Sequence, residues 1–74
     1  MVRACILIRV VPKRARDVFN DIRMIGGVKK VMMVYGRFDV VALLEMDDID
    51  GIVNITKKIN SIEGARRTET LVEA

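Results

Sequence analysis

The chain has 74 residues, 51% of them hydrophobic, and thirteen basic residues against ten acidic ones give it a net charge of +3. Its single cysteine excludes an internal disulfide, and the absence of histidine argues against structural zinc and against acid–base catalysis at neutral pH. We therefore expect one domain over residues 1–74, with no metal, no cofactor and no catalytic residue. Because a core of this size is marginally stable alone, we also expect association with another chain.

The composition also bears on location and on large partners. Arg3 and Arg9 interrupt the first apolar run, so it does not resemble a signal peptide. No apolar run approaches the roughly 20 residues that cross a bilayer. A free cysteine is typical of the reducing cytoplasm, which predicts a cytoplasmic protein without a membrane segment. The basic residues are scattered in short pairs, and no strand is rich in aromatic residues, so we expect no direct DNA binding.

The first half of the chain indicates a strand and a helix. Residues 2–10 alternate in part, with Val2, Ala4, Ile6, Ile8 and Val10 on one face, which predicts a strand. Pro12 suits the first turn of a helix, and apolar residues at helical spacing continue as far as residue 25. The Gly26-Gly27 pair ends this helix.

The second half predicts a hairpin, a helix and a last strand. Residues 28–35 and 38–46 are expected to pair through Gly36-Arg37, a two-residue turn of type II′. Asp47-Asp48 caps a helix over residues 49–62, and residues 65–73 form the fourth strand. The order strand–helix–strand–strand–helix–strand predicts an α+β fold, a ferredoxin-like βαββαβ plait with both helices on one sheet face.

The sheet face that the helices leave bare is expected to be apolar. It carries Leu7, Val41 and Leu43, together with one of two sets, Met33/Tyr35 or Met32/Val34. An apolar face of this extent is an aggregation hazard unless another surface covers it. We predict that a second sheet packs against it and forms a dimeric α+β barrel.

Asp39 is the residue whose position most suggests a site. One interpretation is a turn-stabilising carboxylate that accepts backbone N–H bonds. The other is a receptor for the ammonium group of a small zwitterion, with the amides of Gly36 and Arg37 nearby and Tyr35 and Phe38 as walls. Hydroxyl groups of Thr68 and Thr70 could add to the site from another subunit, although β-propensity alone explains threonine in a strand.

Two motifs carry a family resemblance. Gly36-Arg37-Phe38-Asp39 is followed by an apolar strand, and Gly64-Ala65-Arg66-Arg67-Thr68-Glu69-Thr70 follows the second helix. The chain resembles the effector domain (RAM domain) of the Lrp/AsnC (leucine-responsive) family of transcription regulators over essentially all of its length. It begins at the first strand, and so is similar to the stand-alone members without a helix-turn-helix.

The resemblance implies an amino-acid-binding and oligomerisation module that regulates the transcription of amino-acid metabolism genes. It implies a sheet-to-sheet dimer, dimers joined into an octameric or decameric ring, and co-assembly with full-length Lrp/AsnC regulators. It also places a free amino acid between dimers, against residues Tyr35, Gly36, Arg37, Phe38 and Asp39, with Thr68 and Thr70 as contributors. The chain departs from the family at Arg37, a position that is often acidic.

Three other interpretations remain open from the residues. An ACT-type amino-acid-binding module has the same element order, but its site usually contains a glycine at the first strand-to-helix turn, where this chain has none. A dimeric α+β barrel enzyme of the monooxygenase or isomerase kind would need polar groups inside the subunit. A purely structural assembly partner would bind no small molecule.

Overall fold

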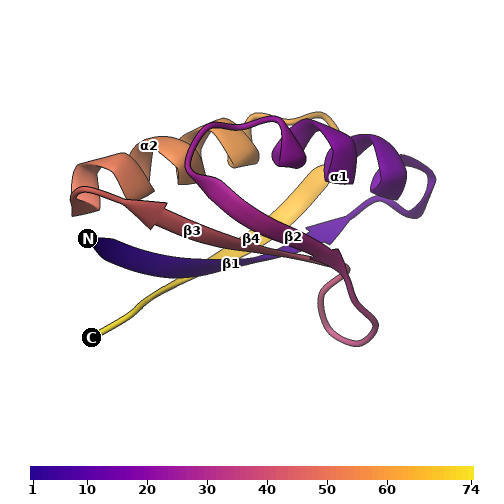
Figure 1. Cartoon of the computed structure of the whole chain (residues 1–74). Helices are drawn as coiled ribbons and strands as arrows, with labels where there is room; N and C mark the ends of the chain where they lie inside the picture. Colours follow the sequence, from indigo (N-terminus) through magenta and orange to yellow (C-terminus); the bar gives the residue numbers. More distant parts are fainter.

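The computed structural model describes residues 1–74 and shows a sheet with two helices on one face (Figure 1). In chain order its elements are β1 (Val2–Val10), a 3-10 turn (Pro12–Arg14), α1 (Ala15–Arg23), β2 (Val28–Met33), β3 (Val40–Met46), α2 (Ile49–Asn60) and β4 (Ala65–Val72). This βαββαβ order confirms the predicted ferredoxin-like α+β plait. The first predicted helix is shorter than expected, because its first residues form the 3-10 turn that Pro12 begins.

The four strands form one antiparallel sheet in the order β2-β3-β1-β4. The two strands at its centre, β1 and β3, supply most of its apolar residues. Alternation places Ile6 and Ile8 of β1 and Ala42 of β3 toward the helices, where all three are completely buried. Twelve buried residues form the core, and all of them are apolar.

The helices are held over this face by their apolar stripes and by a cap. Val18 and Ile22 of α1, and Ile52, Ile55 and Ile59 of α2, are buried against the sheet. Burying one such side chain stabilises the fold by about 1.5–3 kcal/mol. The carboxylate of Asp48 accepts a hydrogen bond from the backbone N–H of Gly51, with 2.9 Å between the atoms, which confirms the predicted cap of α2.

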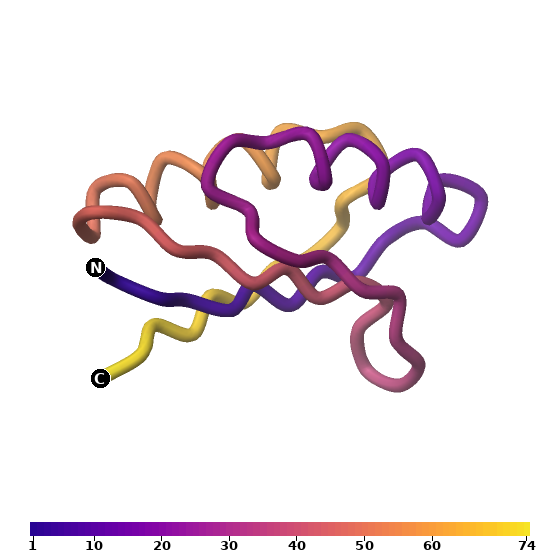
Figure 2. The backbone as a smooth tube through the Cα atoms, viewed as in Figure 1, coloured from indigo at the N-terminus to yellow at the C-terminus, as the bar shows by residue number.

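The opposite face of the sheet carries no helix, and we call it the open face (Figure 2). The strand register resolves which methionine lies on it, because Met32 pairs with Val41, and Val41 pairs with Leu7. The open face is formed by Arg3, Cys5, Leu7, Arg9, Lys30, Met32, Val41, Leu43, Glu45, Arg67, Glu69 and Leu71. It therefore combines apolar residues at its centre with charged residues toward both ends.

The connection between β2 and β3 differs from the predicted two-residue turn. The register is the expected one, since Met33 pairs with Val40 and the N–H of Val34 donates to the carbonyl of Asp39 at 2.9 Å. Tyr35 and Phe38 do not continue the pairing, so residues 34–39 form a wider loop, which we call the hairpin loop. It projects from the sheet on the side away from the helices (Figure 2).

Both ends of the chain lie at the other end of the sheet (Figure 1). Their proximity follows from the pairing of β1 with β4, in which Ala4 lies opposite Val72. The N–H of Glu73 donates to the carbonyl of Arg3 at 2.9 Å and extends this pairing by one residue.

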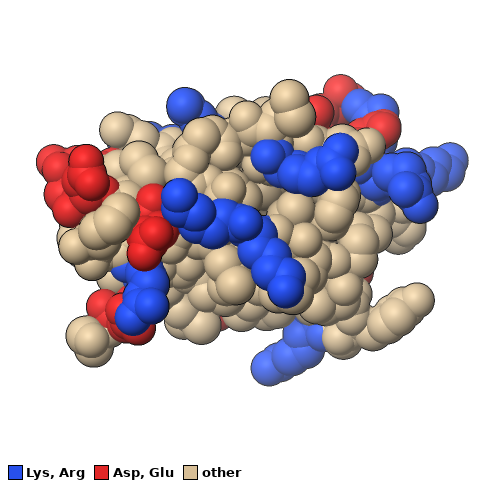
Figure 3. Space-filling view, viewed as in Figure 1, with Lys and Arg blue, Asp and Glu red and all other residues tan.

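The charged side chains form no single patch on the face shown in Figure 3, where Lys and Arg occupy several separate places with neutral surface between them. Neither helix has the length and apolar character needed to cross a bilayer.

Candidate functional site: the hairpin loop and two hollows of the open face

The hairpin loop is anchored to the end of β1 through Asp39. The backbone N–H of Asp39 donates to the carbonyl of Ile8 at 2.9 Å. Its side-chain Oδ2 accepts a hydrogen bond from the backbone N–H of Val10, also at 2.9 Å. The pairing of β1 with β3 ends at Ile8 and Val40, so Asp39 supplies the acceptor that the next strand residue would otherwise supply.

Asp39 therefore stabilises the loop, as one of the two interpretations expected, but its carboxylate accepts from the Val10 N–H of β1 and from no N–H of the hairpin itself. Its second carboxylate oxygen, Oδ1, has no hydrogen bond within the chain. One oxygen stabilises the loop, and the other remains able to accept a hydrogen bond from a ligand.

Tyr35 and Gly36 lie at the tip of the hairpin loop. The Tyr35 side chain is fully exposed and lines neither of the two hollows described below, so within one chain it does not form the wall that the sequence predicted. Gly36 has a φ of +123°, which favours glycine, and a β-carbon at this position would meet no atom within 4 Å. The conformation of the backbone, rather than close packing within the chain, requires glycine here.

Arg37 and Phe38 line a polar hollow of about 300 Å³, which we call the arginine hollow; its other lining residues are Arg9, Arg67 and Glu69. Arg9 donates from Nη1 to the backbone carbonyl of Arg37 at 2.6 Å, which ties β1 to the loop. The sequence prediction missed Arg9, Arg67 and Glu69. They are separated from the loop along the chain. The pairing of β1 with β3 and the bonds of Asp39 to β1 bring Arg9 to the loop, and the pairing of β1 with β4 adds Arg67 and Glu69.

Thr68 and Thr70 do not reach the hairpin loop of their own chain. In β4 they lie opposite Ile8 and Ile6, which places them on the helix-covered face. The Thr68 hydroxyl donates to Oδ1 of Asn60 at 2.6 Å, and the Thr70 hydroxyl lies 3.2 Å from that of Thr56. Within one chain these threonines join β4 to α2, and the site that includes them remains a prediction about neighbouring subunits.

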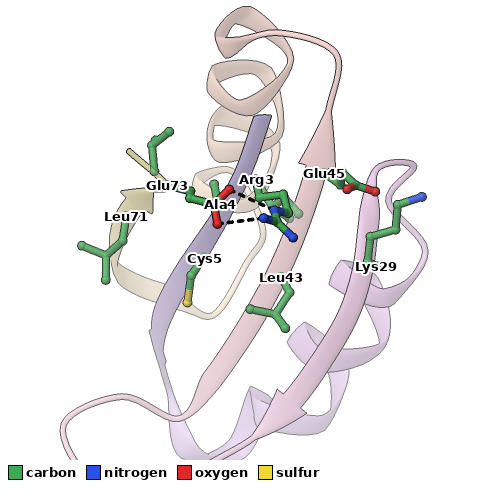
Figure 4. Close-up of a pocket in the computed structure, with 10 residues that line it drawn as sticks. Arg3, Ala4, Cys5, Lys29, Leu43, Glu45, Leu71 and Glu73 are labelled. Carbon is green, nitrogen blue, oxygen red and sulfur yellow. Dashed lines mark hydrogen bonds and ion pairs between the residues drawn. The ribbon is translucent and has the colours of Figure 1, made fainter. Parts of the chain in front are cut away.

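A second hollow, of about 500 Å³, occupies the opposite end of the open face (Figure 4). Its apolar lining includes Cys5, Leu43 and Leu71. At its edge the Arg3 guanidinium binds both carboxylate oxygens of Glu73, at 2.9 and 3.0 Å. This hydrogen bonding, together with the charge of Glu73, raises the pKa of Arg3, while burial raises the pKa of the Cys5 thiol.

The two hollows differ in chemistry. The larger one is apolar and wide, which suits contact with another protein surface. The smaller one combines three guanidinium groups with one carboxylate and one aromatic ring, which suits a small polar molecule. No cluster of three or more His, Cys, Asp or Glu side chains is placed to hold a metal ion.

Comparison with known proteins identifies the family. The family described as the Lrp/AsnC ligand binding domain matches residues 3–73. The chain belongs to this family. The match favours the Lrp/AsnC interpretation over an ACT-type module, and it covers nearly the whole fold described above.

Solved structures show the same fold. TTHA0845 from Thermus thermophilus is 35% identical, with a TM-score of 0.95, and the match covers 100% of this chain and 94% of that one. The protein FFRP-DM1 is 28% identical, with a TM-score of 0.92 and full coverage of both chains. A comparison with curated proteins found no match.

A longer protein shows the same fold in a complex. The transcriptional regulator NMB0573 from Neisseria meningitidis, solved as a complex with L-Met, is 17% identical, with a TM-score of 0.85. The match covers 99% of this chain and 49% of that regulator, so the Lrp/AsnC domain described here corresponds to about half of it.

Proposed function

We propose that the chain is an amino-acid-binding and oligomerisation module that acts in the transcription regulation of amino-acid metabolism. The observation that carries this proposal is the match of residues 3–73 to the Lrp/AsnC ligand binding domain. The complex of NMB0573 with L-Met supports an amino acid as the ligand class. Because a protein in this role works together with DNA-bound regulators, the proposal includes a cytoplasmic location.

The interior of the chain favours a binding module over a barrel enzyme. An enzyme of related fold would need polar groups inside the subunit, whereas all twelve buried residues here are apolar. The polar groups that could contact a ligand lie instead at the surface, around the hairpin loop. We therefore propose no catalytic role for the chain.

The open face supports a sheet-to-sheet dimer. Leu43 and Leu71 are exposed there, and the hollow of about 500 Å³ between them is largely apolar. A core of twelve residues is small, so covering this face with a second copy would add buried apolar area that one chain cannot provide. We propose that such dimers join into an octameric or decameric ring and co-assemble with longer Lrp/AsnC regulators.

In this assembly the hairpin loop is the proposed ligand contact. The exposed Tyr35, the free Oδ1 of Asp39 and the backbone of Gly36 and Arg37 would face a neighbouring dimer. Thr68 and Thr70 of a neighbour would contribute only if their contacts with α2 rearrange.

The proposal is tested by a thermal-shift screen against the common amino acids, with native mass spectrometry of the same samples. We expect at least one amino acid to raise the melting temperature and to change the mass distribution of the assembly. A chain that stays monomeric and responds to no amino acid would refute the proposal.

A further inference from the structure

The arginine hollow contains two like charges that the sheet places directly opposite each other. Arg9 of β1 pairs with Arg67 of β4, and both lie on the open face because the neighbouring Ile8 and Val10 are buried under the helices. Like charges at paired positions of neighbouring strands destabilise a sheet. An anion bound between the two guanidinium groups would offset this repulsion.

The chain itself compensates these charges only in part. The one carboxylate in the hollow belongs to Glu69, and its Oε2 lies 3.9 Å from Nη2 of Arg67, near the limit for an ion pair. Arg37 adds a third guanidinium from the hairpin loop, so three positive charges against one negative charge leave the hollow with a net charge of +2.

The backbone contact of Arg9 contributes to the shape of the hollow. The bond from Nη1 of Arg9 to the Arg37 carbonyl leaves the other N–H groups of this guanidinium without a partner in the chain. Guanidinium groups present a planar fork of donors that matches the two oxygens of a carboxylate or phosphate. The ring of Phe38 adds an apolar wall at the loop side.

We propose that the arginine hollow binds the oxyanion group, carboxylate or phosphate, of a small molecule with net negative charge. Its volume of about 300 Å³ is at the small end of the range for ligand pockets, which suits a molecule about the size of an amino acid. If the proposed amino-acid function holds, on which this part rests, the ligand is an acidic amino acid. Its ammonium group would then bind Oδ1 of Asp39, and its side-chain carboxylate would enter the hollow.

The test is calorimetric titration in phosphate-free buffer of constant ionic strength, with four probes. L-glutamate carries two carboxylates and an ammonium group, and glutarate is the same dicarboxylate without the ammonium group. Inorganic phosphate offers an oxyanion alone. L-leucine has the ammonium group and only one carboxylate. We expect at least one of the three anions to bind more tightly than L-leucine. The anion that binds with the lowest Kd shows whether the hollow prefers an amino acid, a dicarboxylate or a phosphate.

Arg67→Gln is the decisive variant, and Arg16→Gln is its matched control. Both remove one positive charge from an exposed arginine, but Arg16 lies on α1, outside the hollow. Losing a charge-assisted hydrogen bond should weaken anion binding about tenfold or more in Arg67→Gln. The control should bind as the unaltered chain does. Arg37→Gln, in the exposed loop, provides a second variant if Arg67→Gln unfolds.

Several results would overturn the inference: no binding of any anion, equal binding of L-leucine and L-glutamate, or equal weakening by Arg67→Gln and Arg16→Gln. Dissociation of the assembly by Arg67→Gln with unchanged anion binding would also overturn it, since the arginine would then serve a subunit contact. The outcome is separable from that of the proposed function. Binding of phosphate or glutarate without any amino acid supports the hollow and refutes the amino-acid role, whereas binding of L-leucine alone does the reverse.

Discussion

The carboxylate of Asp39 accepts a hydrogen bond from the backbone N–H of Val10, a residue that is almost fully buried at the end of β1. A residue at the base of the hairpin loop thus completes the hydrogen bonding of the central strand. Under the proposed function, stability and binding are coupled at this position, and different substitutions separate the two roles.

Asp39→Ala should destabilise the chain, because it leaves the Val10 N–H without an acceptor. The expected loss in the free energy of unfolding is about 1–3 kcal/mol. Asp39→Asn retains an acceptor oxygen, so its loss should be smaller than that of Asp39→Ala. Chemical denaturation of the two variants gives this comparison. Equal stability of the alanine variant and the unaltered chain would show that the bond contributes nothing.

Asp39→Asn should also weaken binding of the best amino acid by about 10- to 150-fold, the effect of losing a charge-assisted hydrogen bond of about 1.5–3 kcal/mol. Titration calorimetry of the asparagine variant and the unaltered chain measures the ratio. Equal affinities would remove Asp39 from the site and leave it with the structural role alone.

Leu43→Asp should dissociate the assembly, because it places an unpaired charge between two packed sheets at a cost of at least about 2 kcal/mol. Its matched control is Val53→Asp on the outer surface of α2, since Leu43 is 37% exposed and Val53 is 42% exposed in the single chain. The control should cost less than about 1 kcal/mol and leave the mass unchanged. Light scattering measures the mass of the assembly in both variants. Identical masses for the two variants would contradict pairing through the open face.

Cys5 should react slowly with iodoacetamide at neutral pH. Burial raises the pKa of its thiol, which lowers the fraction of reactive thiolate in the folded chain relative to the chain unfolded in urea. The same shift predicts full stability below the ordinary thiol pKa and a decrease as the pH rises above it. Mass spectrometry of alkylation in both states tests the prediction, and equal rates would contradict it.

The 74-residue chain should not bind DNA with sequence specificity, because its net charge is only +3 and its basic side chains are dispersed. Weak retardation in a gel at low salt should disappear at about 200 mM salt, as expected for phosphate contacts alone. A footprint on one sequence that persists at that salt concentration would refute this prediction.

Local patterns in the sequence were sufficient for the elements and their order. The alternation in β1, the glycines after α1 and the Asp48 cap each act within a few residues, and they predicted the plait. The pairing of β2 with β3 was also predicted, but the sequence left open whether Met32 or Met33 lies on the open face, and the pairing of Met32 with Val41 decides this. The hairpin loop was wider than expected, since its conformation depends on the bonds of Asp39 to β1, which pattern alone does not indicate.

The candidate site could be predicted only in part. Arg37 and Phe38 were named from their place beside Asp39, but Arg9 and Arg67 are far apart in sequence and meet only through the register of β1 and β4. The face occupied by Thr68 and Thr70 depends on the same register. Alternation within β4 shows that the two threonines share a face, but only the pairing with Ile8 and Ile6 shows that this face lies under the helices.

The proximity of the two ends of the chain makes it a candidate for circular permutation. A short linker could join Ala74 to Met1, because Ala4 and Val72 are already paired and the Glu73 N–H binds the Arg3 carbonyl. New ends could then be opened at Gly36, where an added β-carbon would meet no atom within 4 Å. Such a permutant would keep every strand and helix while cutting the hairpin loop. A reporter inserted at that cut would sit beside the arginine hollow, where it would report on binding of the proposed ligand.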